Sequence, residues 1–173
     1  MLNGWKKVAD RPLRILYWLP YLLTVVITLF LIFYWKHIPA QVPQHWNSAG
    51  VIDDYADAGS YICLLIFLYF MLAWHALFIV IIPSFCGKEN LFGKHAGALA
   101  TDADVTQGTR FILYLLMWID LLMAFMFAYI ILCGVFLCNL GAWFLPVTIG
   151  VMIIDIIYYL WRLYRLSREI ALR

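Results

Sequence analysis

The residues best suited to chemistry lie in one polar stretch of the first half of the chain, "IPAQVPQHWNSAGVIDDYADA". It contains His45, followed at short spacing by Asp53, Asp54 and Asp57. An imidazole and carboxylates are suitable ligands for a divalent cation, although no rigid spacing defines a metal site here. Two alternatives stand beside that reading. These side chains recognise a peptide or protein, or His45 and Asn47 hydrogen-bond the loop to itself while the acids face water.

A second set of ionisable residues interrupts the apolar runs themselves: His75, Asp120 and Asp155. At helical rise, all three fall about 10 to 15 Å from the same expected membrane surface. Ionisable side chains in a bilayer cost on the order of 3 kcal/mol each and normally face the interior of a helix bundle, so we expect them to cluster. Such a cluster either responds to protons or cations, or acts as polar contacts that hold the helices together.

The elements that position these residues follow from composition. Of 173 residues, 66% are hydrophobic and 13% are charged, whereas about half and about a quarter are usual in soluble domains. We therefore expect an all-α integral membrane protein, a four-transmembrane-helix bundle in contact with the lipid bilayer over a single membrane domain, residues 1–173. The expected helices cover 13–36, 60–85, 109–138 and 142–164, with an outer loop at 37–59 and an inner loop at 86–108. The first apolar run is longer than a signal-peptide core and lacks a cleavage pattern after it, so we expect it to be retained.

The distribution of positive charge predicts the orientation. Eleven of the twelve Lys and Arg residues precede the first helix, lie in the inner loop or at its edge, or follow the fourth helix, and only Lys36 falls on the other side. By the positive-inside rule, both termini are cytoplasmic and the polar stretch is outside. The asymmetry either serves orientation alone or also attracts anionic lipid to the inner face.

Cysteine usage does not predict a disulfide framework. Cys133 and Cys138 share the expected outer side, but a spacing of five residues fits a continuous helix poorly. The sequence leaves open whether these two pair.

The outer loop contains strong signals for local structure. Pro39 cannot continue the first helix, and Pro43 restricts its predecessor toward extended geometry. Asn47 and Gly50 then stand at turn spacing. We expect a short β-hairpin or a tightly ordered loop that returns to the membrane surface.

The order of six residues in this loop resembles the signature of domain of unknown function family 1648. These residues are Pro39, Pro43, His45, Asn47, Gly50 and Asp53. The resemblance implies a small multi-pass protein of the bacterial cytoplasmic membrane with a binding role at the outer loop. The same module begins SdpI-type proteins, which implies immunity against a secreted toxic peptide and signalling at the membrane. This chain differs in reading "DAGSY" where family members commonly carry a Lys, and nothing in it resembles the second SdpI-type domain.

No nucleophile motif, metal box, phosphate-binding loop or cofactor motif accompanies the candidate residues. We therefore expect no enzyme, no catalytic residues, no cofactor, no bound metal and no nucleic-acid partner. The sequence predicts a binding or regulatory membrane protein that recognises a peptide or protein at its outer loop. The alternative is a small transporter or accessory permease subunit that uses His75, Asp120 and Asp155, as a homo-oligomer because four helices enclose little space.

Overall fold

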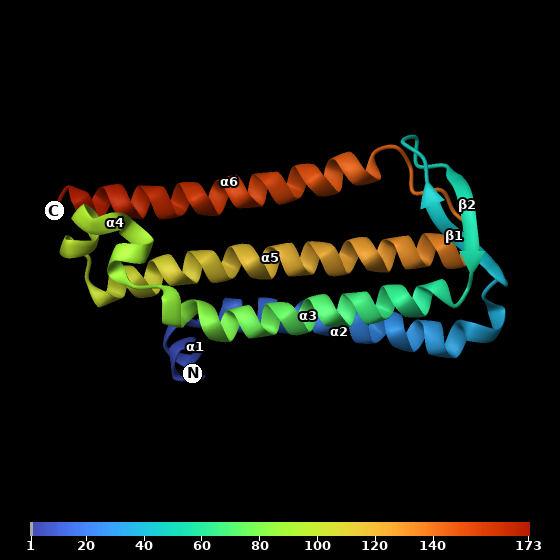
Figure 1. Ribbon diagram of the computed structural model, residues 1–173, viewed down its shortest axis with the longest axis horizontal. Helices are drawn as coiled ribbons and strands as arrows, with labels where there is room; N and C mark the ends of the chain where they lie inside the picture. Colours follow the sequence, from blue (N-terminus) through green and yellow to red (C-terminus); the bar gives the residue numbers. More distant parts are fainter. Residues whose placement is uncertain (1) are drawn as a thin grey trace. The chain divides into compact units, whose positions relative to one another are not determined.

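The computed structural model describes residues 2–173, and most of them are helical (Figure 1). Four helical segments of the described chain are long and apolar enough to cross a membrane, and they are built on α2, α3, α5 and α6. The elements in chain order are α1 (Leu2–Val8), α2 (Arg11–Tyr34), the 3-10 turn η1 (Trp35–His37), β1 (Gln41–Trp46), β2 (Ile52–Asp57), α3 (Ser60–Phe85), α4 (Lys88–Leu99), α5 (Asp102–Val135) and α6 (Phe144–Ala171).

Helix α5 begins at Asp102, seven residues before the expected start at residue 109. Asp104 accepts hydrogen bonds from the backbone N–H and the hydroxyl of Thr101, at 2.9 and 2.7 Å. The Thr101 hydroxyl lies 3.3 Å from the Asp104 backbone N–H in return. This reciprocal pair satisfies backbone groups at a helix N-terminus, so the polar residues after Thr101 are already helical.

The end of α6 also extends beyond the expected residue 164, because the additional turns are packed. Leu166 and Ile170 are buried together with Phe92 and Phe111 in one hydrophobic cluster. That cluster also explains why a helix, α4, occupies most of the expected inner loop. Gly93, with a φ of 75°, breaks α4 into two short helical pieces.

Contacts divide the chain into two compact units. The hairpin unit comprises Trp18–Leu72 and Asp120–Met152, and the basic unit comprises Met1–Tyr17, Ala73–Ile119 and Ile153–Arg173. Eleven Lys and Arg residues fall in the basic unit against six acids, whereas the hairpin unit has Lys36 against four acids. The two units therefore carry charge of opposite sign.

The basic unit is fastened by two buried or half-buried carboxylates. Asp10 accepts a hydrogen bond of 2.7 Å from the Tyr114 hydroxyl and lies 3.4 Å from the Arg110 guanidinium. Asp104, besides its contact with Thr101, holds the Arg173 guanidinium through two hydrogen bonds of 2.9 and 3.2 Å. These contacts hold α1, the start of α5 and the end of α6 within the unit.

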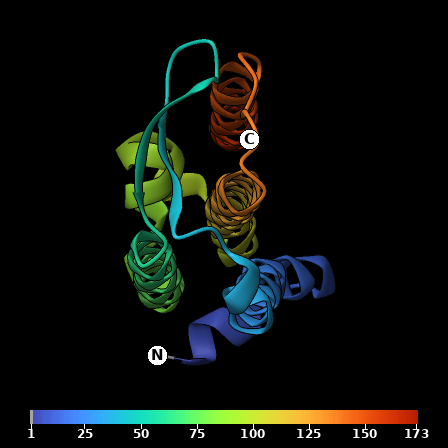
Figure 2. The same cartoon turned by 90° about the vertical axis from the view of Figure 1, so that its right-hand side faces the viewer.

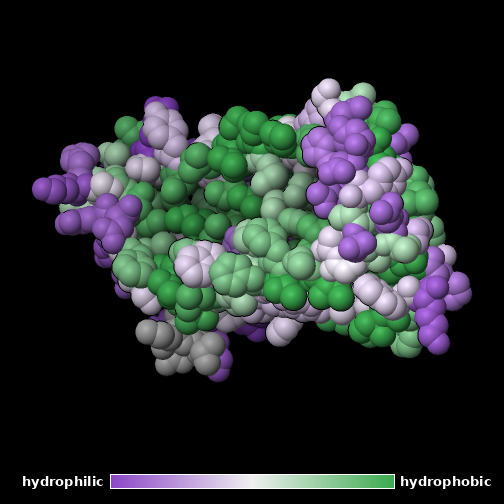
Figure 3. Space-filling model, turned by 45° about the vertical axis from the view of Figure 1, so that its right-hand side comes forward, coloured by the Kyte–Doolittle hydropathy of each residue, from purple (hydrophilic) through white to green (hydrophobic). Residues whose placement is uncertain are grey.

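The hairpin unit contains a small antiparallel sheet, as the turn signals predicted. Strands β1 and β2 pair over six residues each, and Figure 2 shows them extending across the ends of the helical segments in this unit. The hydrophobic cluster beneath the sheet includes Val42, Tyr61 and Ile131. Hydrophilic side chains gather over the hairpin, at the right of Figure 3, and hydrophobic ones cover the middle of this face.

Candidate functional site

The tip of the hairpin is built by Asn47. Its side-chain oxygen accepts hydrogen bonds from the backbone N–H groups of Ala49 and Val51, at 2.9 and 3.1 Å. Its own carbonyl accepts from Gly50 N–H at 2.8 Å. An Asn side chain that bonds the backbone two residues on stabilises a turn. Asn47 therefore has the structural role that one of the sequence readings gave it.

Gly50 docks the hairpin tip on the turn between α5 and α6. Its carbonyl accepts hydrogen bonds from the backbone N–H groups of Leu140 and Gly141, at 2.9 and 3.4 Å. Gly50 has a φ of 71°, and a Cβ at this position would collide with the Gly141 backbone. Only glycine combines a positive φ with so close an approach of two backbones.

Two further hydrogen bonds complete this junction. The Asn139 side-chain oxygen accepts from Ile52 N–H at 3.1 Å. The Trp46 indole N–H donates to the Cys138 carbonyl at 3.2 Å. The hairpin and the α5–α6 turn thus form one structure, although more than eighty residues separate them in sequence.

His45 lies between two irregularities in the sheet. On β1, Pro43 pairs with Tyr55 and His45 pairs with Asp54, so Gln44 is an extra residue between them. On β2, Asp53 is an extra residue, because the next pair joins Trp46 to Ile52. Such bulges re-aim side chains. His45 Nδ1 lies 2.5 Å from Asp53 Oδ1 as a result.

This pairing fixes the chemistry of the imidazole. An ionised carboxylate only accepts hydrogen bonds, so Nδ1 carries the proton and Nε2 is left for another partner. The side chains of His45 and Asp53 are 64% and 40% exposed. A pair so exposed contributes roughly 0–1 kcal/mol to stability. The pair therefore contributes little to holding the fold together.

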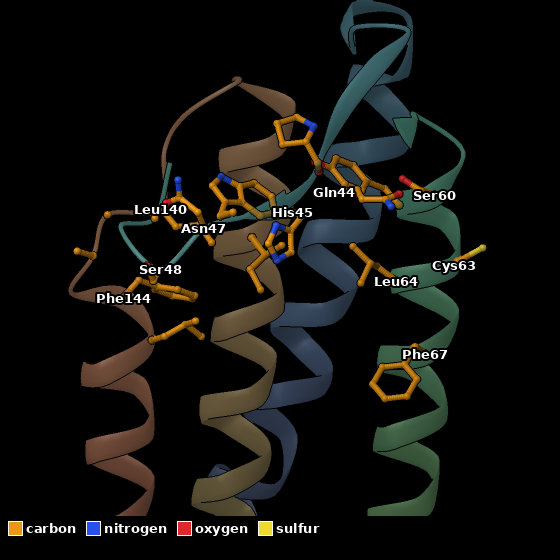
Figure 4. Close-up of a pocket in the computed structure, with 18 residues that line it drawn as sticks. Gln44, His45, Asn47, Ser48, Ser60, Cys63, Leu64, Phe67, Leu140 and Phe144 are labelled. Carbon is orange, nitrogen blue, oxygen red and sulfur yellow. The ribbon is translucent and has the colours of Figure 1, made fainter. Parts of the chain in front are cut away.

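Beneath the hairpin lies a cavity of about 640 Å³, within the range of about 300–1,000 Å³ usual for small-ligand sites. Its walls come from β1, the hairpin tip, α3, α5 and the start of α6, and they are mostly apolar. Figure 4 shows His45 below the hairpin backbone, between Leu64 on α3 and Phe144 on α6. Gln44, Asn47, Ser48 and Ser60 add polar groups to the lining.

One wall of this site depends on an aromatic side chain. Tyr61, at the start of α3, is buried and donates a hydrogen bond of 3.0 Å to the Pro43 carbonyl. Gly134 on α5 makes room for it, because a Cβ there would collide with the Tyr61 hydroxyl and ring. Pro43 is itself fully buried. Pro39 precedes the sheet and is half-buried, after the helical turn that ends at His37.

Within residues 2–173, no group of three or more His, Cys, Asp or Glu side chains is placed to hold a metal ion. Among the candidate acids of the hairpin, Asp53 pairs with His45 and Asp54 lies 3.4 Å from the Gln44 amide. All four cysteines are free thiols in the described chain, Cys133 and Cys138 included.

The three ionisable residues of the apolar runs fall in different units. Asp120 is buried in the hairpin unit, whereas His75 and Asp155 are half-buried in the basic unit. One carboxylate oxygen of Asp155, Oδ2, is buried and has no hydrogen-bond partner among the described residues. Their clustering stays a prediction.

Several residues that form the site were not singled out by sequence reasoning. Tyr61 and Gly134 pack against each other, and Asn139 and Leu140 bind the hairpin. A glycine inside an apolar helix was a usable signal of close packing. No local sequence pattern indicates the contacts of the α5–α6 turn, because they join it to a hairpin that is distant in the sequence.

Comparison with known proteins identifies the segment that carries the hairpin. Residues 22–68 match the family described as Domain of unknown function (DUF1648). The match lies wholly in the hairpin unit and contains all six signature residues. No curated protein and no solved structure matches the chain. In residues 22–68, this chain therefore contains a DUF1648 domain.

Proposed function

We propose that this chain is a multi-pass protein of a bacterial cytoplasmic membrane that binds a peptide or protein at its outer face. Both termini are cytoplasmic in this proposal, and the β1–β2 hairpin is outside. The distribution of Lys and Arg between the two units supports that orientation. The observation that carries the binding role is the largely apolar cavity of about 640 Å³ beneath the hairpin.

The chemistry of the site supports one class of ligand. The walls, with Leu64, Phe67 and Phe144, suit a large apolar side chain. Residues 37–59, which carry the hairpin over the cavity, contain three Asp residues and no Lys or Arg, so the hairpin attracts positive charge. The ligand is therefore a cationic peptide segment with an apolar or aromatic anchor. An immunity or signalling role of the SdpI type is compatible with such a ligand.

His45 gives the site its orienting group. Asp53 holds the imidazole through Nδ1, so Nε2 is the atom that a bound peptide contacts. Backbone carbonyl and N–H groups of an extended segment are suitable partners for it.

The test measures peptide binding to the purified full-length protein. The probes are fluorescently labelled hexapeptides that contain Phe and Leu with either Lys or Glu. Leu64 lines the cavity and its side chain points into it from α3 (Figure 4), whereas Ile62, two residues earlier, does not line it. Leu64→Trp therefore fills the cavity, and Ile62→Trp is the matched control. We expect the Lys peptides to bind the wild-type protein and the Ile62→Trp variant. We expect binding at least about tenfold weaker to Leu64→Trp and His45→Ala, a loss of about 1.4 kcal/mol. Equal binding to Leu64→Trp, or preference for the Glu peptides, would overturn the proposal.

A second proposal is that the chain is a small transporter or accessory permease subunit, as a homo-oligomer. It is supported by the buried Oδ2 of Asp155, which has no hydrogen-bond partner in the described part of the chain. Ionisable groups in such positions mark ion or proton pathways. Proton flux into liposomes that contain the protein should fall with Asp155→Asn and persist with Thr148→Val on the same helix. Equal flux through Asp155→Asn would contradict this second role.

A further inference from the structure

A second cavity, of about 260 Å³, lies within the basic unit between α5 and α6. Gln107 and Phe111 line it from α5. The lining from α6 includes Tyr158, Trp161, Arg162 and Arg165. None of these side chains belongs to the hairpin site, and the cavity is more polar than the one beneath the hairpin.

Arg162 is held in a defined position in this cavity. Its guanidinium carbon lies 4.5 Å from the centre of the Phe111 ring, and its Nη1 donates a hydrogen bond of 2.7 Å to the Tyr158 hydroxyl. Phe111 is itself buried in the hydrophobic cluster with Leu166. Arg162 makes no ion pair with a carboxylate among the residues that the structure describes. A positioned guanidinium with free donors is therefore part of the cavity wall.

The other charges of the cavity nearly balance each other. Arg165 pairs with Glu169 one turn later on α6, at 3.1 Å, and its guanidinium also lies 5.7 Å from the Trp161 ring. Because Glu169 offsets the charge of Arg165, the cavity has an excess of one positive charge, that of Arg162. A ligand with a single negative charge matches this arrangement better than a multiply charged anion does.

We propose that this cavity binds the phosphate group of an anionic phospholipid. A phosphodiester carries one negative charge, and a guanidinium offers it two parallel N–H donors. Gln107 and Trp161 also line the cavity, and both side chains carry N–H donors.

The surroundings on α6 favour a lipid over a free phosphate ion. Ile154, which precedes Arg162 by eight residues, is 67% exposed. At helical rise it lies roughly 12 Å from Arg162 along the axis, within the depth of the acyl chains below a phosphate group. Trp161 and Tyr164 are exposed aromatic side chains of the kind found at membrane interfaces. The inference depends on membrane insertion but not on the ligand of the hairpin.

The test compares lipids that differ in headgroup charge. The full-length protein in detergent micelles is titrated with phosphatidylglycerol or phosphatidylcholine, and the retained lipids are counted by native mass spectrometry. Arg162→Gln removes the guanidinium, and Arg162→Lys keeps the charge without the planar donors. Arg168→Gln is the matched control, because Arg168 is exposed on the same helix and does not line the cavity. Thermal unfolding of each variant shows that it is folded.

We expect the wild-type protein and Arg168→Gln to prefer phosphatidylglycerol, and both Arg162 variants to lose about tenfold of that preference. No preference in the wild-type protein would overturn the proposal. An equal loss of preference for phosphatidylglycerol in Arg168→Gln would also overturn the proposal, because it would show that positive charge attracts anionic lipid without a specific site. Displacement of phosphatidylglycerol by millimolar inorganic phosphate would identify a free-anion site instead. None of these measurements involves a peptide, so their failure is distinct from failure of the proposed function.

Discussion

The hydroxyl of Tyr61 donates a hydrogen bond of 3.0 Å to the carbonyl oxygen of Pro43 in a buried environment. This bond joins the first turn of α3 to β1, and so fixes the strand that carries His45. Pro43 lacks a backbone N–H, and its carbonyl is the group through which α3 binds it. Pro43, which belongs to the signature, is therefore held in place by Tyr61, which does not.

Tyr61→Phe should destabilise the protein by about 1–2 kcal/mol, because the Pro43 carbonyl loses a buried hydrogen bond while the packing of the ring is kept. Thermal unfolding in detergent measures the effect. Tyr55→Phe is the control, because Tyr55 is exposed on β2, and its effect should stay within about 0.5 kcal/mol. Equal effects of the two variants would contradict the role given to Tyr61.

Gly134→Ala should destabilise the protein by about 1–3 kcal/mol, because the new methyl group occupies the position of the Tyr61 hydroxyl. Gly150→Ala on α6 is the matched control, since nothing lies within 4 Å of the added Cβ. That control should stabilise its helix by roughly 0.5–1 kcal/mol. Thermal unfolding should therefore shift the midpoint down for Gly134→Ala and up for Gly150→Ala. An unchanged midpoint for Gly134→Ala would contradict the prediction.

Gly50→Ala should detach the hairpin tip from the α5–α6 turn, because alanine is strained at a φ of 71° and its Cβ meets the Gly141 backbone. Hydrogen exchange at the amides of Ile52 and Leu140 should accelerate, as both hydrogen bonds belong to this junction. Gly59→Ala, where the added Cβ meets nothing within 4 Å, should leave the exchange at these amides unchanged. Protection that persists in Gly50→Ala would show that the junction does not depend on glycine.

Leu137→Gly should stabilise the protein by about 1 kcal/mol. Leu137 has a φ of 53° at the end of α5, where the Cys138 N–H bonds the Cys133 carbonyl at 2.7 Å and the Leu137 N–H bonds the Gly134 carbonyl. This is the helix ending in which glycine is most favourable, and a side chain there costs roughly 1–2 kcal/mol. Leu137→Ala keeps the Cβ and should give no such gain in thermal stability.

The proposed orientation predicts which cysteines a membrane-impermeant maleimide can reach in intact cells. In a variant whose other cysteines are replaced by serine, the maleimide should label the exposed Cys138 in intact cells. A cysteine introduced by Lys94→Cys, at an exposed position on α4, should react only after the membrane is permeabilised. The reverse pattern would invert the orientation derived from the Lys and Arg distribution.

Local sequence signals predicted the elements of the fold well. The apolar runs indicated four long helices, and the prolines with Asn47 and Gly50 indicated a hairpin. The boundaries that differ, at Asp102 and Ala171, depend on a capping pair and on packing against α4. Neither is visible in a hydropathy pattern.

The candidate site was only partly predictable. His45 and Asp53 could be singled out because they lie in one short polar stretch and belong to the signature that the loop resembles. The walls of the cavity come from α3, α5 and α6, and which faces of these helices meet is decided by long-range packing. The register shifts that bring Asp53 to His45 likewise depend on how two strands pair.

The docking of Gly50 on Leu140 and Gly141 has a consequence for protein engineering. Residues 22–68 contain the hairpin, but the backbone groups that receive its tip belong to Leu140 and Gly141, 72 and 73 residues beyond the end of that segment. A chimera that transplants residues 22–68 into another membrane protein would leave the hairpin without its base. A graft that retains the cavity must also carry the α5–α6 turn and the lining residues on either side of it, from Ile130 to Leu145.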